Sequence, residues 1–368
     1  MRVIVTGGGT GGHIYPAMAV AKRLEERIND IHVLYVGTRD GMESRLVPEN
    51  EIEFQGISGK GLSKKIGVET VRTVGLNLRA LWETKKILKD FRPDLVLGTG
   101  GYVSGPVVLA AAIFGIPTLL HEQNVFPGKT NRFLARMVKK VMLSFPESES
   151  FLPRDKTEVV GLPVREDIGK IDRKTAAKEF NIDPQKKTLL VTGGSRGALS
   201  INKAMIHILL QLEKYPEIQV IWGTGSATYQ TIIDELEASG IRYQRSNWVV
   251  REYINNMPQA LACSDLCICR AGAVTLAELS TAGVASILIP YPHASDNHQE
   301  YNARAFEEKG AAKVILDKEL NGSILWDELM KVVFNPFVLE EMSAKTKNVL
   351  QPGALDCIVE ICLRTAWK

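Results

Sequence analysis

The sequence has 368 residues, of which 45% are hydrophobic and 24% charged, and its formal net charge is only +3. This composition is typical of a folded globular protein and excludes extensive disorder, and the near-neutral charge gives no support to nucleic-acid binding. The length exceeds what a single hydrophobic core usually serves, so we expect two domains.

The chain lacks the sequence patterns of an exported or membrane-spanning protein. Its longest apolar stretch, residues 107–120, contains a glycine and a proline and is shorter than the roughly 20 residues that span a bilayer. A strand pattern follows Met1 and Arg2 directly, without a cleavable apolar leader. We therefore expect a cytoplasmic protein. Its five cysteines lack the paired spacing of a zinc site and are expected to be reduced and buried.

Short β-type segments alternate with helical patterns along nearly the whole chain, which is typical of α/β proteins built on parallel sheets. In the first half the sequence predicts a strand, a glycine-rich loop and a helix in succession, followed by further strands. The predicted strands are 2–6, 31–37, 94–98, 117–122 and 140–145, and the helix is 16–28.

The second half restarts with the same succession. Val5-Thr6-Gly7-Gly8 and Val191-Thr192-Gly193-Gly194 each join an apolar strand to a glycine-rich loop, which indicates a weak internal repeat. Glycine and proline punctuate the segment between the halves, so we place a domain boundary near Leu162. We expect two Rossmann-like domains, residues 1–162 and 163–345, with ligands bound in a central cleft at the carboxyl ends of the strands. The elements predicted in the second half are strands 188–192, 219–223, 265–269 and 285–290 and a helix at 199–212.

The first loop, Gly7-Gly8-Gly9-Thr10-Gly11-Gly12-His13, has the spacing of a dinucleotide-binding loop, which alone is a weak signal. A nicotinamide enzyme places an acidic residue at the end of the second strand to hold a ribose, whereas here that strand ends in Gly37-Thr38-Arg39. Since Arg39 suits a 2′-phosphate, an oxidoreductase stays open, as does a tight turn that merely needs small residues.

His13 follows this loop directly, at the expected start of a helix. The positive end of the helix dipole favours the neutral imidazole, which is the form that takes up a proton. We interpret His13 as a candidate general base, and the alternative is a purely structural histidine.

Two further segments favour binding of an anionic group. The loop Gly193-Gly194-Ser195-Arg196-Gly197-Ala198 adds a hydroxyl and a guanidinium to the same backbone arrangement. The run 270–278 turns a strand end into a helix, and its small residues leave the helix N-terminus open to a diphosphate. Glu278, one turn inside, suits the two hydroxyls of a ribose, although Thr275 and Glu278 also have the spacing of a capping box.

The segment around residues 60–92 combines basic and apolar side chains, which indicates a local surface of that kind. Its basic residues are Lys60, Lys64, Lys65, Arg72, Arg79, Lys85, Lys86, Lys89 and Arg92, and its interleaved apolar residues are Leu76, Leu78, Leu81 and Trp82.

Taken together, these segments resemble one family, the undecaprenyl-diphospho-muramoyl-pentapeptide β-N-acetylglucosaminyltransferases of glycosyltransferase family 28. The motifs follow the family's order from residue 7 to about residue 303 and are jointly specific. Arg196 stands where glutamine is frequent, and His298-Gln299 stands where a Gln-Gln pair can occur. The motifs are Gly8-Gly9-Thr10-Gly11-Gly12-His13 with Pro16, Gly100-Gly101-Tyr102-Val103-Ser104-Gly105-Pro106, His121-Glu122-Gln123-Asn124, Gly161-Leu162-Pro163-Val164-Arg165, Gly193-Gly194-Ser195-Arg196-Gly197-Ala198, residues 271–278 and His298-Gln299-Glu300-Tyr301-Asn302-Ala303.

The resemblance implies a GT-B fold, with the acceptor on the N-terminal half, the donor mainly on the C-terminal half, and a last helix, within 346–368, packed back on the N-terminal half. It implies inverting transfer of N-acetylglucosamine from UDP-N-acetylglucosamine (UDP-GlcNAc) to the 4-hydroxyl of the muramoyl sugar of lipid I. This acceptor is undecaprenyl-diphospho-MurNAc-pentapeptide, and the products are lipid II and UDP. No metal or other cofactor is expected, because a helix N-terminus and backbone donors can neutralise the leaving diphosphate.

Because the lipid chain of the acceptor stays in the bilayer, the resemblance also implies peripheral attachment to the cytoplasmic face of the membrane. We expect residues 60–92 to dock on an anionic membrane surface. The alternative is an ordinary amphipathic helix whose apolar residues pack inward and whose charges are solvated.

Matching positions carry the roles of individual residues. His13 is the expected base and Glu122 the runner-up. Gly9, Tyr102 and Ser104 are expected on the acceptor side. The expected UDP-GlcNAc site has Glu278 on the ribose, Ile254 on the uracil, and Asn124 and Gln299 on the sugar hydroxyls. Its remaining members are Thr10, Gly11, Gly12, Arg165, Ser195, Ala273, Val274, Thr275, Leu276 and Ala277.

Two other classes of protein stay open at this point. A related GT-B enzyme would act on a different acceptor, or would epimerise UDP-GlcNAc without any acceptor. A non-catalytic nucleotide-sugar sensor would bind the donor only, and transfer to a lipid I analogue would exclude it.

Overall fold

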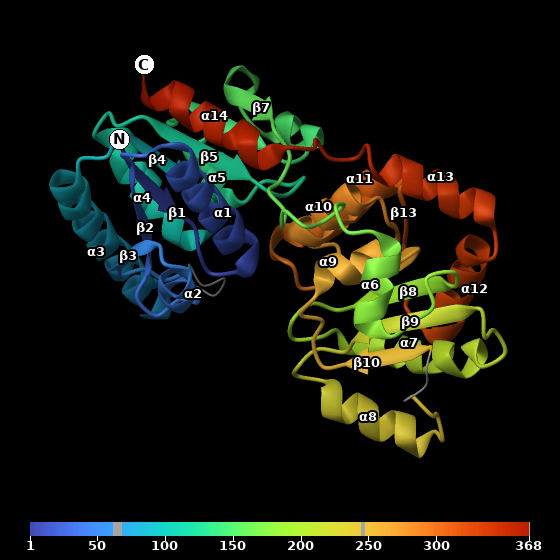
Figure 1. Ribbon diagram of the computed structural model, residues 1–368. Helices are drawn as coiled ribbons and strands as arrows, with labels where there is room; N and C mark the ends of the chain where they lie inside the picture. Colours follow the sequence, from blue (N-terminus) through green and yellow to red (C-terminus); the bar gives the residue numbers. More distant parts are fainter. Residues whose placement is uncertain (62–67, 244–246, 368) are drawn as a thin grey trace. The chain divides into compact units, whose positions relative to one another are not determined.

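The computed structural model describes residues 1–61, 68–243 and 247–367 and divides into two compact units (Figure 1). The first unit holds residues 1–163 and the chain from Gln351 onward, and the second holds Val164–Leu350. The crossing between them therefore follows Pro163, within the Gly-Leu-Pro-Val segment that punctuates the sequence.

A seven-stranded sheet forms the centre of the first unit. Its strand order is β3-β2-β1-β4-β5-β6-β7, and every neighbouring pair is parallel. Because the order reverses direction between β1 and β4, these two strands flank a topological switch point. The strands are β1 (Arg2–Thr6), β2 (His32–Thr38), β3 (Glu53–Ile57), β4 (Leu95–Gly98), β5 (Thr118–Glu122), β6 (Lys140–Leu143) and β7 (Thr157–Val159).

Helices cover both faces of this sheet, which explains why its strands are nearly continuous apolar runs. Val3 and Val5 of β1 pack with residues of α1, α2 and α14, whereas Ile4 between them packs in the core formed with α3, α4 and α5. The helices are α1 (Gly11–Arg27), α2 (Glu43–Glu49), α3 (Val68–Phe91), α4 (Gly101–Ile113), α5 (Lys129–Leu134) and α14 (Ala354–Ala366), with short 3₁₀ turns η1 (Pro146–Phe151) and η2 (Arg154–Lys156).

The last helix, α14, lies alongside α1 in the first unit (Figure 1). Its residues Ile358 and Cys362 are fully buried in the core that α1 also lines. At the solvent side Arg23 pairs with Asp356, at 3.7 Å between Nε and Oδ1. Since exposed ion pairs contribute little, burial of the apolar face supplies most of what holds α14 in place.

The second unit repeats the architecture with a six-stranded parallel sheet. Its order is β10-β9-β8-β11-β12-β13, so β8 and β11 flank its switch point. The strands are β8 (Lys187–Thr192), β9 (Ile218–Gly223), β10 (Trp248–Arg251), β11 (Leu266–Cys269), β12 (Ala285–Leu288) and β13 (Ala312–Val314). The helices are α6 (Arg173–Phe180), α7 (Leu199–Leu212), α8 (Tyr229–Ala238), α9 (Met257–Ala262), α10 (Ala273–Ala282), α11 (His298–Glu308), α12 (Gly322–Val333) and α13 (Pro336–Thr346), with the 3₁₀ turn η3 (Ser295–Asn297).

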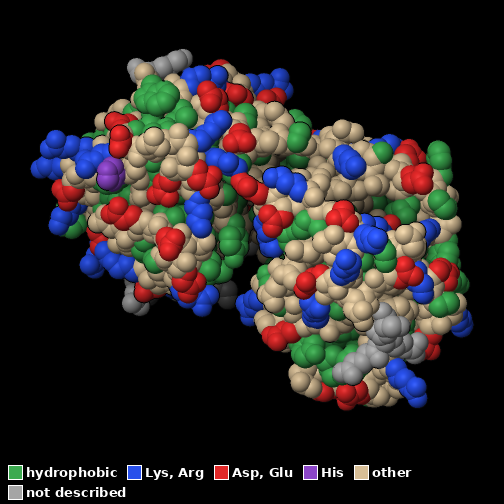
Figure 2. Space-filling model, in the orientation of Figure 1, with side chains coloured by type: hydrophobic (Ala, Val, Ile, Leu, Met, Phe, Trp, Pro, Cys, Tyr) green, Lys and Arg blue, Asp and Glu red, His purple; other side chains and the backbone are tan. Residues whose placement is uncertain are grey.

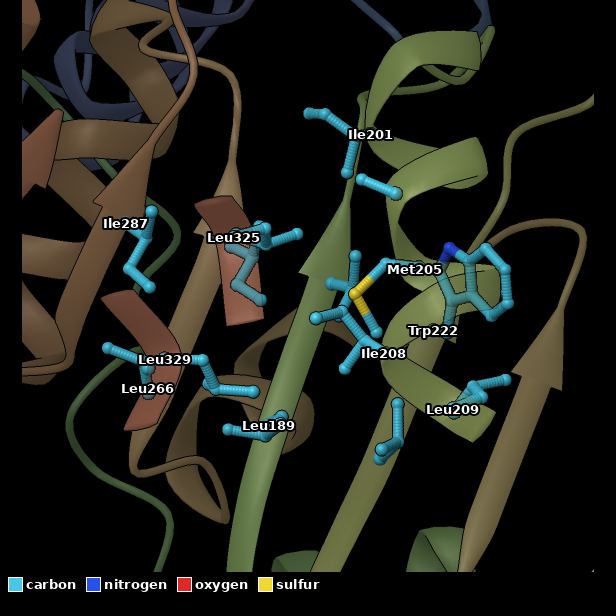
Figure 3. Close-up of a cluster of buried hydrophobic side chains, with 14 of the residues drawn as sticks. Leu189, Ile201, Met205, Ile208, Leu209, Trp222, Leu266, Ile287, Leu325 and Leu329 are labelled. Atoms are coloured by element: carbon cyan, nitrogen blue, oxygen red, sulfur yellow. The ribbon is translucent and has the colours of Figure 1, made fainter. Parts of the chain in front are cut away.

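The core of this unit lies between its sheet and α7 and α12 (Figure 3). Met205 from α7 and Leu325 from α12 approach the strands that carry Leu189 and Leu266. Trp222 of β9 is fully buried, and its indole N–H donates to the Asn202 side chain at 3.1 Å. The aromatic ring is thus buried without leaving its polar atom unpaired.

The two parallel sheets confirm the predicted α/β class with two Rossmann-like units. The predicted start of the first helix, however, was wrong. Helix α1 begins at Gly11, not at residue 16, and Pro16 lies inside it. Proline lacks the N–H that would bond to the carbonyl four residues earlier, and that position is Gly12, in the first turn. The missing hydrogen bond therefore concerns a carbonyl of the first turn, and His13 belongs to that turn.

The other difference concerns the strands that the sequence did not predict. These are β3, β7, β10 and β13, which are the outermost strands of the two sheets. An outermost strand is covered less completely, so its residues need not be uniformly apolar, as Glu53 and Gln55 of β3 illustrate. Strands β3, β7 and β13 consequently lack the continuous apolar run that marks the inner strands, whereas β10 has an apolar run of only three residues, 248–250.

The five cysteines are free thiols, four of them buried and Cys357 partly exposed. Burial raises the pKa of Cys263 to about 11 and that of Cys362 to about 12, so both stay protonated at neutral pH. None of the helices within residues 1–61, 68–243 and 247–367 combines the length and apolar character needed to cross a bilayer.

Candidate active site

Each unit presents loops at the carboxyl ends of the strands that flank its switch point. In the first unit these loops follow β1 and β4, and in the second they follow β8 and β11. Open α/β sheets bind their ligands at this place. These loops, together with the helices that begin directly after them, contain most of the residues predicted from the sequence.

The glycine loops of the first unit interlock. Gly101 has a φ of +82°, and a Cβ there would lie 2.1 Å from the carbonyl oxygen of Gly8. A Cβ on Gly7 would lie 2.0 Å from Oγ1 of Thr99. Any side chain at these positions would push the loops apart, so glycine is required by close backbone approach as well as by conformation.

A buried carboxylate lies beneath this pair of loops. Glu43, at the first turn of α2, is fully buried and accepts hydrogen bonds from Thr38 N at 3.0 Å, Thr38 Oγ1 at 2.6 Å and Gly9 N at 3.3 Å. A Cβ on Gly8 or Gly41 would lie within 2.6 Å of the Glu43 carboxylate. Glu43 therefore fixes the shape of the Gly7–Thr10 turn, and sequence reasoning missed it.

His13 lies in the first turn of α1 and is partly buried. Its Nδ1 lies 3.0 Å from the carbonyl oxygen of Thr99 and 2.9 Å from Oε1 of Gln123. With Nδ1 held by these two oxygens, Nε2 is the ring nitrogen left for a reacting group. The arrangement suits a base oriented by its neighbours.

The carboxylate of Glu122, the alternative base, is taken up by hydrogen bonds from neighbouring residues. Glu122 is 1% exposed, and its carboxylate accepts from Asn124 N, Asn124 Nδ2, Gly128 N and Asn131 Nδ2 at 2.8 to 3.2 Å. These donors occupy both oxygens and hold the loop that follows β5. The geometry favours a positioning role for Glu122 and makes Asn124, which is only partly buried, the better placed of the two to meet a ligand.

Tyr102 and Ser104, predicted on the acceptor side, differ in placement. Tyr102 is partly exposed, and its ring packs on the α-carbon of Gly9, where a Cβ would lie 2.9 Å from Cε1. Ser104 is fully buried, and its hydroxyl donates to the carbonyl oxygen of Gly101 at 3.1 Å. Ser104 therefore supports the start of α4, while Tyr102 reaches the surface beside the loop.

In the second unit the loop after β8 is tied down by backbone contacts. The carbonyl oxygen of Ser195 accepts from Ser226 N at 3.1 Å, and a Cβ on Gly197 would lie 2.1 Å from the carbonyl oxygen of Thr224. The Ser195 and Arg196 side chains are exposed. Their hydroxyl and guanidinium thus extend from a backbone whose shape is already set.

The helix after β11 begins earlier than a capping box would require. Its N-cap is Gly272, so Thr275 is the third helical residue and cannot be the N-cap of a Thr275–Glu278 box. The N–H groups of Ala273, Val274 and Thr275 occupy the first turn, where a helix has no backbone acceptors of its own. This end of α10 favours an anionic group, and Leu276 and Ala277 behind it are buried in the unit.

Glu278 lies one turn further along and is 7% exposed. Burial raises the pKa of its carboxyl, and the nearby Arg165 guanidinium partly counteracts that effect. Arg165 Nε lies 3.5 Å from Glu278 Oε1, and the arginine is about half exposed. A largely buried carboxylate beside an uncapped helix start is an unusual and costly arrangement, which suits a ligand that supplies hydroxyl donors.

The two remaining predicted residues are held differently. Ile254 is 2% exposed, and its side chain packs on Gly223. Gln299, in the first turn of α11, accepts from Tyr291 N at 3.0 Å through Oε1. Asp296 and Asn297 just before it have φ values of +51° and +56°, a conformation that costs free energy in residues other than glycine.

Within the described ranges, no three histidine, cysteine, aspartate or glutamate side chains are grouped as a metal site. Charged side chains of both signs are dispersed over the visible face of each unit, as the near-neutral net charge would suggest (Figure 2).

Helix α3 presents an outward stripe. Leu78 and Trp82 are 62% and 68% exposed, and Lys85 and Lys89 continue the same face at helical spacing. Leu81 instead packs against the core. Lys64 and Lys65 of the predicted basic surface lie outside the described residues, as does the side chain of Arg72.

Comparison with known proteins identifies the class of this chain. Residues 3–143 match the glycosyltransferase family 28 N-terminal domain, and residues 188–355 match the family 28 C-terminal domain. The crystal structure of Acinetobacter baumannii MurG superposes with a TM-score of 0.79 at 31% identity, covering 99% of both chains. A UDP-GlcNAc 2-epimerase from Neisseria meningitidis bound to UDP-GlcNAc has a TM-score of 0.67 at 18% identity, which shows a shared fold alone.

The curated relatives are more specific. A protein of Desulfitobacterium hafniense (strain Y51) is 57% identical over the full length of both chains, and one of Bacillus subtilis (strain 168) is 41% identical over 96% of both. Each is a UDP-N-acetylglucosamine–N-acetylmuramyl-(pentapeptide) pyrophosphoryl-undecaprenol N-acetylglucosamine transferase. The chain belongs to this family of glycosyltransferases, and its two parallel α/β sheets are the GT-B-like architecture predicted from the sequence.

Proposed function

We propose that this protein transfers N-acetylglucosamine from UDP-GlcNAc to the 4-hydroxyl of the muramoyl sugar of lipid I, giving lipid II and UDP. The observation that carries the proposal is the 57% identity to a transferase of this activity along the whole chain. The loops at both switch points supply the chemistry that such a transfer needs, with a candidate base in one unit and anion-binding helix starts in the other.

The second unit binds the donor in this proposal. Glu278 accepts hydrogen bonds from the ribose hydroxyls, and Ile254 contacts the uracil. The first-turn N–H groups of Ala273, Val274 and Thr275 hold the diphosphate, together with the Ser195 loop. Arg165 contributes from beside Glu278, at 3.5 Å from its carboxylate. Leu276 and Ala277 support the helix that carries these groups, and Gln299 reads the sugar hydroxyls.

The first unit binds the acceptor and carries the base. Nε2 of His13 takes the proton of the acceptor hydroxyl as that oxygen attacks the anomeric carbon of the donor sugar. Gly9 and Tyr102 line the acceptor side, Asn124 reads the donor sugar, and Thr10, Gly11 and Gly12 approach the reacting groups closely because they lack bulk.

Departure of UDP leaves negative charge on the diphosphate. The partial positive charge at the start of α10 and its backbone N–H groups stabilise that charge as it develops. The first turn begins after Gly272, so no Cβ at the N-cap stands between the phosphate and these donors. The chain's own residues therefore supply both the base and the stabilisation of the leaving group.

Attachment to the membrane follows from the nature of the acceptor, whose undecaprenyl chain stays in the bilayer. We propose that the protein acts at the cytoplasmic face and that α3 docks there through its exposed stripe. Leu78 and Trp82 insert shallowly, and Lys85 and Lys89 meet anionic headgroups at about 1 kcal/mol each. An amphipathic helix packed inward would account for Ala80 and Ile87, which are buried, but not for this stripe.

The experiment is an assay of UDP release with UDP-GlcNAc and a water-soluble lipid I analogue, with the lipid product identified by mass spectrometry. We expect release that depends on the acceptor and a product heavier by one N-acetylglucosamine. Turnover of UDP-GlcNAc without acceptor would indicate an epimerase instead. Binding of UDP-GlcNAc without turnover, both with and without the lipid I analogue, would indicate a sensor and contradict the proposal.

A further inference from the structure

A chain of buried hydrogen bonds leads from His13 through Gln123 and His121 to the backbone carbonyl of Gly161. His121 lies near the end of β5, and Gln123 directly follows that strand. The Gln123 side chain contacts both His13 and His121. Gln123 and His121 are each 1% exposed. The donor and the acceptor of each hydrogen bond can be assigned, because the chain ends at a backbone carbonyl, which can only accept.

The direction is set at Gly161. Its carbonyl oxygen can only accept, and His121 Nε2 lies 2.9 Å from it, so that nitrogen carries a hydrogen. Burial lowers the pKa of His121 to about 4, so the ring is neutral at ordinary pH. Its Nδ1 is consequently a bare acceptor, and Gln123 Nε2 donates to it at 3.1 Å.

The amide of Gln123 is oriented by two further carbonyls. Its Nε2 lies 2.7 Å from the carbonyl oxygen of Thr99 and 3.1 Å from that of His121, and only the NH₂ group fits between such acceptors. The amide oxygen must therefore point the other way, toward His13, whose Nδ1 lies 2.9 Å from it. Thr99 offers a second acceptor to the same nitrogen at 3.0 Å.

From these constraints we propose that Gln123 and His121 are positioning residues that hold His13 in its Nδ1–H tautomer, with the lone pair on Nε2. Nδ1 faces two acceptors and no donor, so in the neutral ring it must carry the hydrogen. Nε2 is then the only ring nitrogen that can accept a proton. The role of that lone pair rests on the proposed function, whereas the tautomer itself does not.

The anchor of the chain is rigid. Gly161 has a φ of +84°, and a Cβ there would lie 2.3 Å from the carbonyl oxygen of Gln351. Gly161 precedes the crossing after Pro163, and Gln351 is where the chain re-enters the unit. The hydrogen-bond chain thus ends on backbone that two separate segments hold in place.

The tautomer can be read directly by NMR of the full-length protein labelled with ¹⁵N-histidine. The long-range proton–nitrogen correlations of His13, identified by their loss in His13→Gln, are expected to show a protonated Nδ1 and a bare Nε2 near neutral pH. A protonated Nε2, or an even mixture of the two tautomers, would overturn the proposal. This readout does not depend on any enzymatic activity.

Gln123→Leu removes the amide oxygen that faces His13. We expect the uniform tautomer to give way to a mixture, and kcat to fall by about tenfold to a hundredfold while the dissociation constant of UDP-GlcNAc stays nearly unchanged. The matched control is Gln219→Leu in the second unit, since Gln219 is also 1% exposed and hydrogen-bonded through its amide, at 2.8 Å to Asp183. An equal loss of kcat in both variants would reduce the role of Gln123 to stability alone.

Gln123→Glu serves where the leucine variant does not fold. A carboxylate next to Nδ1–H favours the charged ring, so the acid limb of kcat moves to higher pH. Activity lost near neutral pH should therefore return in more alkaline buffer. A uniform loss at every pH, with no move of the limb, would contradict the proposal.

The other titratable groups around this chain are accounted for. His121 is linked to His13 through Gln123. The carboxylate of Glu122 is engaged by its own donors, among them Asn131 Nδ2 at 2.8 Å. Glu43 lies beneath Gly9, to which it is hydrogen-bonded. Glu122 and Glu43 are unaltered in the Gln123 variants, whereas His121 loses the donor on its Nδ1 and Gln123→Glu adds a carboxyl group. The moved acid limb is therefore assigned to His13 by following its ring nitrogens in the same NMR spectra. Absence of transfer with the predicted tautomer intact would count against the proposed function and not against this inference.

Discussion

The buried imidazole of His121 predicts how stability depends on pH. Its pKa is lowered from 6.5 to about 4, first by burial and then by the proximity of His13, while the hydrogen bond to Gly161 acts in the opposite direction. Below pH 6.5 the unfolded chain takes up a proton that the folded chain refuses. Acidification therefore favours unfolding, and the effect is complete once the pH falls below the folded-state pKa.

The magnitude follows from the size of the shift. A difference of about 2.5 units corresponds to about 3 kcal/mol in full, of which about 2 kcal/mol is lost between pH 7 and pH 5. This is a substantial part of a stability that is typically about 5–15 kcal/mol.

The assay is urea unfolding of the wild type and of His121→Gln, followed by circular dichroism at both pH values. Glutamine does not titrate, so the variant should lose about 2 kcal/mol less than the wild type on acidification. Other acid-sensitive groups are common to both proteins and cancel in this comparison. Equal losses in the two proteins would refute the claim that His121 is buried in its neutral form.

The remaining predictions concern other parts of the molecule. Glu278→Ala should weaken UDP-GlcNAc binding by about tenfold to a hundredfold in calorimetry, since hydrogen bonds to a charged group contribute about 1.5–3 kcal/mol; lost stability with normal affinity would contradict the ribose role. Glu43→Gln places an NH₂ group against Gly9 N, so acceptor KM should rise with little change in donor affinity, and an unchanged acceptor KM would refute its support of the loop. Leu78→Glu with Trp82→Glu should reduce co-sedimentation with anionic vesicles, and raised salt should weaken wild-type binding; salt-insensitive binding would reject the docking surface.

Much of the architecture was predictable because its signals are local. The inner strands are continuous apolar runs, and the repeated strand, glycine loop and helix mark both units. The four outermost strands escaped prediction since their pairing is decided by partners elsewhere in the chain. Pro16 misplaced the start of α1 for a similar reason, because the glycines that tolerate it precede it in the first turn.

The candidate site divides along the same line. Residues on the glycine loops and helix starts could be predicted, because sequence spacing places them at strand ends. The role of Glu43 could not be predicted, because its partner Gly9 lies 34 positions earlier in the chain. The contact between His13 and Gln123 could not be predicted either, because these residues are 110 positions apart. The run His121-Glu122-Gln123-Asn124 drew attention to the right segment, but only the fold shows which of its side chains face His13 and which hold the loop.

The most direct test of the central claim is a single-turnover measurement of sugar transfer by His13→Ala and the wild type. Both proteins are saturated with UDP-GlcNAc and mixed with a lipid I analogue, and the formation of the lipid product is followed in time. We predict that the variant binds the donor normally but forms product slower by about a hundredfold or more, because the acceptor hydroxyl has lost its base. Product formation by His13→Ala at a rate close to that of the wild type would contradict the account.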